Sequence, residues 1–192
     1  NYLIDSGFNG FLLVNESIDN TDVIHQKTFK VIISATSSIK TQKTTFIQLR
    51  NFKFNNIEID TANVLQGNYY QGNLLGCQIL NQDVTILDFL NNRMYLKKGL
   101  KINKIGIPLP DEDIAFSRLD NQIIAVTVNT ELDNINIEPL DILTEINGEK
   151  IKHDSFNLED LKKKASKEIN HFVLKRNGER IEVKLTKQML GL

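Results

Sequence analysis

The chain has 192 residues, of which 41% are hydrophobic and 24% are charged, and its formal net charge is −1. This composition is that of a folded chain and excludes an intrinsically disordered one. The balance of 23 Lys and Arg against 24 Asp and Glu excludes a global field that attracts nucleic acid or anionic membranes. No stretch carries the roughly 20 apolar residues that span a bilayer. Because Cys77 is the only cysteine, an intrachain disulfide and a zinc site of several thiolates are also excluded.

The first half of the chain carries short apolar runs separated by Asn, Gly, Ser and Lys. The runs are rich in β-branched and aromatic residues, which is typical of strands joined by short turns. They predict an all-β unit over residues 1–98, with one short helix at 76–82. The chain begins without Met at what reads as the end of a strand, so we expect it to be a piece of a longer protein. The predicted strands are residues 11–14, 29–33, 45–49, 57–59, 84–87 and 94–96.

A polar break at residues 97–101 separates this unit from a different pattern. Strands are predicted at 123–128 and 141–146, and a helix at 158–167 with Asn157 as its N-cap. Leu158, Leu161 and Ala165 share one face of that helix. Two further strands, 171–176 and 180–185, are joined by Asn177-Gly178, a dipeptide that favours a two-residue hairpin turn. Residues 102–192 are therefore predicted to form a small α+β domain, and the chain as a whole is expected to be mainly β.

Asp5-Ser6-Gly7 follows an apolar strand end and precedes another strand, so it predicts a carboxylate on a tight turn. Further along the chain, Leu74-Leu75-Gly76 precedes the short helix and two more strands. This order resembles one lobe of a retropepsin-like aspartic peptidase, in which an apolar-apolar-Gly segment passes beneath an Asp-Thr/Ser-Gly turn. The resemblance covers residues 1–98 and implies that Asp5 is catalytic. It also implies that Ser6 and Gly7 shape the turn, with Leu74, Leu75 and Gly76 supporting it.

The same resemblance implies a flap over the substrate, formed by the hairpin between residues 29–33 and 44–49. An ordinary polar hairpin tip is the alternative reading of this segment. The tip is rich in small and hydroxyl residues, which suit a loop that moves. The flap residues that the resemblance implies are Ala35, Thr36, Ser37, Ser38 and Ile39.

Aspartic peptidase chemistry needs two carboxylates that share a proton and activate one water. Asp60 and Asp88 lack the following Ser/Thr-Gly, so we interpret both as turn or surface residues. The second catalytic Asp must then come from a second copy of the chain or from an upstream lobe of the parent protein.

Residues 139–148 carry a turn that ends in Asp141, an apolar strand and Asn147-Gly148. With the helix and the terminal hairpin, this stretch resembles the PDZ domains attached to bacterial proteases. The resemblance implies a peptide groove lined by a loop at 105–107 and by the helix. Pro108 and the acidic run 111–113 disfavour capture of a terminal carboxylate, which leaves internal segments, docking onto the peptidase lobe, or a domain without ligand. The groove residues implied are Ile105, Gly106, Ile107, Leu158 and Leu161.

These patterns predict an aspartic endopeptidase that acts on polypeptides, with a PDZ-like domain that recruits or positions the substrate. The alternative is a non-catalytic peptide-binding or scaffold protein that keeps the peptidase fold. No metal or cofactor is expected, because the acidic run lacks a coordinating loop pattern and the three histidines are scattered. The resemblance to proteases with attached domains implies an exported protein of the bacterial periplasm or cell envelope.

Overall fold

The computed structural model describes residues 2–15, 18, 22–35, 38–54, 57–68, 72–82, 85–97, 99–132, 134–155 and 157–192. It is mainly β, as the sequence predicts, and its contacts divide it into two units. Unit 1 comprises Asn1–Lys27 and Thr44–Leu109, and unit 2 comprises Thr28–Lys43 and Pro110–Leu192. Compared with the predicted domains 1–98 and 102–192, residues 28–43 belong to the second unit and residues 102–109 to the first. Among the described residues, no helix has the length and apolar character needed to cross a membrane.

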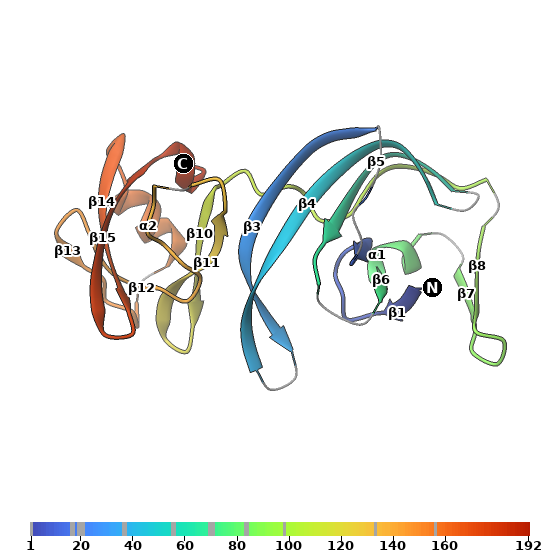
Figure 1. The fold of residues 1–192 in the computed structure, drawn as a ribbon, viewed down its shortest axis with the longest axis horizontal. Helices are drawn as coiled ribbons and strands as arrows, with labels where there is room; N and C mark the ends of the chain where they lie inside the picture. The colour runs from blue at the N-terminus through green and yellow to red at the C-terminus, as the bar shows by residue number, and fades with distance from the viewer. Residues whose placement is uncertain are drawn as a thin grey trace. The chain divides into compact units, whose positions relative to one another are not determined.

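Unit 1 is a mixed sheet with a small separate hairpin, drawn in blue to yellow-green in Figure 1. Its short helix α1 begins directly after Gly76, close to the predicted position. The long strands β3 and β4 form a hairpin whose outer parts belong to unit 1. The elements are β1 (Tyr2–Asp5), β2 (Leu12–Val14), β3 (Val23–Ala35), β4 (Ser38–Phe54), β5 (Ile57–Gln66), β6 (Asn73–Gly76), α1 (Cys77–Leu80), β7 (Thr85–Asp88), β8 (Arg93–Leu96) and β9 (Lys101–Ile105).

The threading of β6 is the feature of unit 1 that positions the candidate site. β6 lies between β1, with which it is parallel, and β2, with which it is antiparallel, although β1 and β2 are consecutive in the chain. β2 then pairs in parallel with β5, which is antiparallel to β4 and parallel to β9. The turn between β1 and β2 therefore wraps around the end of β6.

The core of unit 1 is built from the inward faces of these strands. Phe11 is 1% exposed and meets the rings of Phe52 and Phe54 edge to face, with centroids 6.1 and 5.7 Å apart. Ile59 and Val64 of β5 are equally buried, and Ile102 and Ile105 of β9 join the same cluster. Because β9 buries its two isoleucines against β5, residues 101–105 belong to unit 1.

Unit 2 is an antiparallel sheet with one helix, drawn in yellow to red in Figure 1 apart from the blue hairpin segment. β11 is its central strand, and its end at residues 127–129 pairs with residues 29–31 of β3. The helix carries the predicted cap, since the Asn157 and Asp160 side chains each accept from the other's backbone N–H. The elements are β10 (Ile114–Leu119), β11 (Gln122–Asn129), β12 (Ile142–Ile146), β13 (Glu149–Lys150), α2 (Leu158–Lys164), β14 (Ile169–Arg176), β15 (Glu179–Thr186) and the 3₁₀ turn η1 (Gln188–Leu190).

The core of unit 2 is separate from that of unit 1. Phe116 and Phe172 stack with ring centroids 5.8 Å apart, and Leu143, Ile146 and Leu174 are fully buried around them. The β14–β15 turn has positive φ at both central residues, 51° at Asn177 and 91° at Gly178, as the dipeptide predicts.

Candidate active site

The first candidate site is the turn that follows β1. The Phe8 N–H donates to the Asp5 carbonyl at 3.2 Å, which closes the turn directly after the strand ends. Inside it the Gly7 N–H donates to Asp5 Oδ1 at 2.8 Å, so the carboxylate is held against its own backbone. Asp5 is half-buried, whereas Ser6 and Gly7 are exposed. The turn thus orients one carboxylate and leaves the residues around it accessible.

The strand beside this turn is β6, which carries Leu74, Leu75 and Gly76. In the parallel register of β1 and β6, Asp5 lies opposite Gly76. Leu74 and Leu75 are each 2% exposed and pack into the interior of unit 1. A Cβ at Gly76 would lie 2.4 Å from the carbonyl oxygen of Gly10, so the turn passes too close for any side chain there. The structure therefore brings all six residues that the peptidase resemblance implies around the turn into adjacent segments.

Backbone hydrogen bonds fix the turn to the start of α1. The Gly76 N–H donates to the Phe11 carbonyl and the Cys77 N–H to the Phe8 carbonyl, both at 2.9 Å. Cys77 is half-buried, and its Sγ lies 3.6 Å from Asn9 Oδ1. The middle and the end of the 5–11 turn are thus tied to one short segment, and the pairing of Asp5 with Gly76 fixes its start, which restrains the Asp5 position.

The chemistry open to this carboxylate follows from its hydrogen bonds. Among the described residues, the Asp5 side chain accepts its hydrogen bond at Oδ1, which leaves Oδ2 able to accept from a water or a ligand. A lone carboxylate is able to act as a general base, whereas hydrolysis by a carboxylate pair needs a second acid. β1 has β6 as its partner among the described strands, and its apolar residues Tyr2, Leu3 and Ile4 are 49%, 61% and 38% exposed.

The segment assigned to the flap is the inner end of the β3–β4 hairpin. Ala35 ends β3 and Ser38 begins β4, while Thr36 and Ser37 lie outside the described residues. Ile39 is 42% exposed. The hairpin itself is as predicted, but residues 28–43 group with unit 2 because β3 pairs there with β11. The role of the tip as a flap stays a prediction.

The predicted peptide groove requires a correction, because its loop and its helix belong to different units. Ile105 is 3% exposed in the core of unit 1, and Ile107 packs against a small cluster in the same unit. The Gly106 N–H donates to Gln78 Oε1 at 2.6 Å, and its φ of 98° brings its backbone against Asn63. The strand after the polar break pairs in parallel with β5, a long-range partner that local patterns do not reveal.

Leu161 of α2 instead faces β10, the strand that the sequence reading missed. A hollow of about 220 Å³ separates the two elements, and Leu161, Ile114 and Phe116 are its most buried lining residues. Leu158 is the first residue of α2. The alternation of buried Ile114 and Phe116 with more exposed neighbours is the signal that could have placed a strand here. The second candidate site is therefore the groove between β10 and α2, called the β10–α2 groove below.

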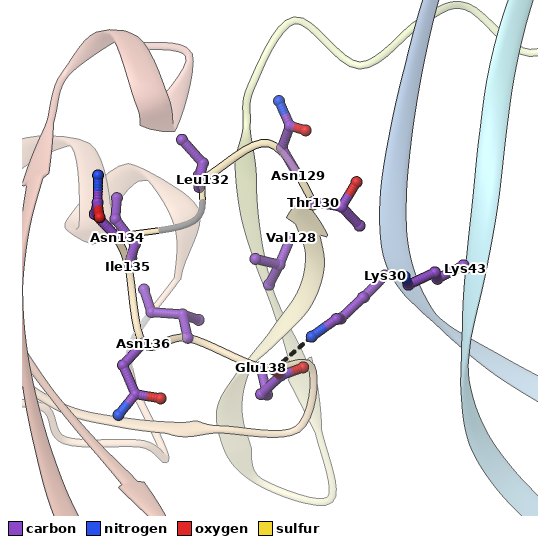
Figure 2. Close-up of a pocket in the computed structure, with 11 residues that line it drawn as sticks. Lys30, Lys43, Val128, Asn129, Thr130, Leu132, Asn134, Ile135, Asn136 and Glu138 are labelled. Atoms are coloured by element: carbon purple, nitrogen blue, oxygen red, sulfur yellow. Dashed lines mark hydrogen bonds and ion pairs between the residues drawn. The ribbon is translucent and has the colours of Figure 1, made fainter.

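A larger hollow of about 500 Å³ lies between the hairpin segment and the loop after β11 (Figure 2). Lys30 reaches from β3 to Glu138, and its Nζ lies 2.5 Å from Glu138 Oε1. Two polar groups around this hollow are already paired: Thr130 Oγ1 donates to the Thr28 carbonyl, and Asn136 Oδ1 accepts from Arg176. The Lys30–Glu138 and Thr28–Thr130 contacts hold this part of β3 against the loop after β11. The lining residues are Lys30, Lys43, Val128, Asn129, Thr130, Leu132, Asn134, Ile135, Asn136, Ile137 and Glu138.

Asp60 and Asp88, the other carboxylates considered for catalysis, lie outside both the Asp5 turn and the β10–α2 groove. Asp60 is exposed on β5, and Asp88 ends β7 and accepts two hydrogen bonds from Asn91. Within the described part of the chain, no group of His, Cys, Asp and Glu is arranged to hold a metal ion.

No protein-family model, curated protein or solved structure matches this chain. The two candidate sites are therefore the features of the chain that bear on its function.

Proposed function

We propose that this chain contributes one half of an aspartic peptidase and that Asp5 is one of its two catalytic carboxylates. The observation that carries the proposal is the register of β1 with β6, which places the Asp5 turn over Gly76. An ordinary surface turn needs no buried Leu-Leu-Gly strand beside it and no glycine whose Cβ position is filled by backbone. This construction instead suits a carboxylate that must keep one orientation during a reaction.

In the proposed reaction a water molecule lies between Asp5 and a second, protonated Asp. Asp5 removes a proton from the water as its oxygen attacks the scissile carbonyl carbon, and the second Asp gives its proton to the carbonyl oxygen. As the C–N bond of the tetrahedral intermediate breaks, Asp5 gives its proton to the leaving amine nitrogen, and a hydroxyl of the intermediate returns a proton to the second Asp. The second carboxylate comes from another copy or from an upstream lobe. The exposed apolar residues of β1 are suited to pack against that copy or lobe.

The test is cleavage of a mixed peptide library by the full-length protein, from acidic to neutral pH, beside its Asp5→Asn variant. This substitution keeps the shape of the side chain and removes its titrating carboxylate. Asp60→Asn is the matched control, because Asp60 is exposed on β5 and outside the turn. We expect Asp5→Asn to lose at least about a thousandfold in rate, and Asp60→Asn to keep the parent's rate.

Cleavage that survives in Asp5→Asn overturns the assignment of Asp5. Equal unfolding midpoints for the three proteins separate loss of chemistry from loss of structure. If the parent itself cleaves nothing, the non-catalytic alternative takes precedence, in which the protein binds peptides without cutting them.

The β10–α2 groove favours that second function independently of Asp5. β10 pairs with β11 along one edge, and among the described strands its other edge has no partner. An extended peptide can add to such an edge while its side chains pack against the neighbouring helix. A strand edge beside a helix resembles the peptide-binding arrangement of PDZ domains. In the peptidase, this groove would recruit or position the substrate.

A further inference from the structure

The β10–α2 groove has an apolar floor and one end built from the chain's own last residues. Ile114 and Phe116 are 1% and 5% exposed, and Leu161 is 6% exposed, so the floor is part of the packed core of unit 2. Lys162 stands on the helix side. At the start of β10 the hollow is bounded by Glu112 and by the segment after η1. The full lining is Glu112, Ile114, Ala115, Phe116, Leu161, Lys162, Leu190, Gly191 and Leu192.

The segment 189–192 is fastened to the residues that precede β10. The Asp113 N–H donates to the Met189 carbonyl at 2.9 Å, and Leu190 is 7% exposed in the core of unit 2. Gly191, with a φ of 64°, packs on Glu112 so closely that an added Cβ would lie 3.2 Å from Glu112 Cβ. This end of the groove is therefore occupied by the protein itself.

A terminal carboxylate entering this end would need backbone N–H donors, and Asp113 has none to offer. The Asp113 N–H already donates to the Met189 carbonyl. The Asp113 carbonyl accepts from the Asn129 N–H at 2.7 Å, and Asp113 Oδ1 accepts from Asn129 Nδ2 at 2.8 Å. The neighbouring Asp111 and Glu112 bear the same charge as the incoming group. A carboxylate placed here would lose its water and meet the negative charges of Asp111 and Glu112. Lys162 is the cation that lines the hollow, and its Nζ already pairs with Glu159 Oε1 at 3.3 Å.

We infer that the β10–α2 groove binds an extended segment from the interior of a polypeptide and does not recognise a free C-terminus. The inference rests on the proposed peptide-binding role of the groove and names its ligand class. Beside the hollow, at residues 114–116, the open edge of β10 supplies main-chain pairing, which an internal segment can use as well as a terminal one. For a peptidase, this selectivity fits a domain that holds an intact chain rather than a finished product.

The experiment presents the Asp5→Asn protein with one library of short random peptides in two display formats. In the first format each peptide ends in a free carboxylate, and in the second it is flanked by carrier sequence on both sides. Asp5→Asn prevents cleavage from confusing the readout, so failure of the peptidase proposal leaves this binding test intact. We expect enrichment in the flanked format. Selected sequences should bind as C-terminal amides within about twofold of the free acids.

A matched pair of variants places the binding in the groove. Ala115 lines the hollow, whereas Ser117 is exposed two residues further along the same strand and does not line it. Ala115→Arg should weaken the selected peptides at least about tenfold, and Ser117→Arg should leave them unchanged, at equal unfolding midpoints. Stronger enrichment of the free-carboxylate format, an equal effect of both variants, or no enrichment in either format overturns the inference.

Discussion

Arg176 forms an ion pair with Asp141, whose carboxylate is buried. Asp141 is 1% exposed, and its two oxygens accept from Arg176 Nε and Nη2, each at 2.7 Å. Asp141 Oδ2 also accepts the Glu138 N–H at 2.8 Å, so the pair fixes the turn before β12. The hydrogen bond to Asp141 raises the pKa of Arg176 above its ordinary value, so the guanidinium stays charged.

We predict that Arg176→Ala lowers the free energy of unfolding of unit 2 by about 3–5 kcal/mol, because it leaves a buried carboxylate without its partner. Arg176→Lys should recover only part of this loss, since an ammonium group lacks the two-pronged geometry. Arg180→Ala is the control: Arg180 is 56% exposed beside Glu182 and Glu145, so its loss should leave the free energy of unfolding close to that of the parent. Denaturant unfolding of the three variants measures these values, and equal costs at both arginines would contradict the argument.

A second prediction concerns Asp88 at the β7–β8 turn. Hydrogen bonds from the Asn91 side chain, at 2.8 Å, and from its backbone N–H, at 3.1 Å, hold the pKa of Asp88 below its ordinary 3.8. Because the folded-state pKa is the lower one, the carboxylate stabilises the turn at pH values above 3.8. That stabilisation is lost as the pH falls through the folded-state value. A carboxyl-carbon NMR titration should show the depressed pKa, and Asn91→Ala should raise it; an unchanged midpoint in the variant would refute this cause.

Among the elements, β6 is the one on which the candidate active site depends. Gly76→Ala would place a Cβ 2.4 Å from the Gly10 carbonyl oxygen and 2.6 Å from the Phe8 carbonyl oxygen. Backbone atoms cannot yield as a flexible side chain can, so we expect a loss of at least about 2 kcal/mol in unit 1 and a displaced Asp5 turn.

Gly99→Ala serves as the control for Gly76→Ala. Gly99 has a φ of 72° and no neighbour within 4 Å of an added Cβ, so it bears only the strain of about 1–2 kcal/mol expected for a left-handed conformation. Thermal unfolding and the Asp5-dependent cleavage rate should separate the two variants. Retention of full activity by Gly76→Ala would show that the turn can shift without loss of function.

The elements that the sequence predicts correctly are those with a local signal. Asn157 begins a helix because its side chain caps the first turn, and Asn177-Gly178 makes a hairpin because both residues tolerate positive φ. The sequence does not predict β9 or the pairing of β3 with β11, because the strands that pair there are far apart in the sequence. The order of the Asp5 turn and β6 in the chain is the signal that relates them in the sequence. A single glycine such as Gly106 does not indicate which strand it approaches, so its position beside Asn63 is not predicted.

At the scale of the whole molecule, the two apolar clusters explain why a linear domain boundary does not describe this chain. Every residue of the cluster around Phe172 belongs to unit 2, and every residue of the cluster around Phe11 belongs to unit 1. The chain passes from one unit to the other within β3 and again within β4. Composition changes little at those crossings, so no break in the sequence marks them.

The last prediction tests this division with a pair of core substitutions. Phe172→Ala removes a fully buried ring stacked on Phe116, and Phe11→Ala removes one that is 1% exposed between Phe52 and Phe54. Each should cost about 3–5 kcal/mol, because a cavity replaces a large buried side chain.

Hydrogen exchange followed by mass spectrometry should then report two separate responses. Phe172→Ala should lower amide protection in β12, β14 and β15 while β2, β5 and β6 keep theirs, and Phe11→Ala should do the reverse. This follows because each ring contacts residues of its own cluster, and opening of one cluster exposes only the strands that enclose it. An equal loss of protection in both sets of strands from either variant would mean that the chain opens as one cooperative unit.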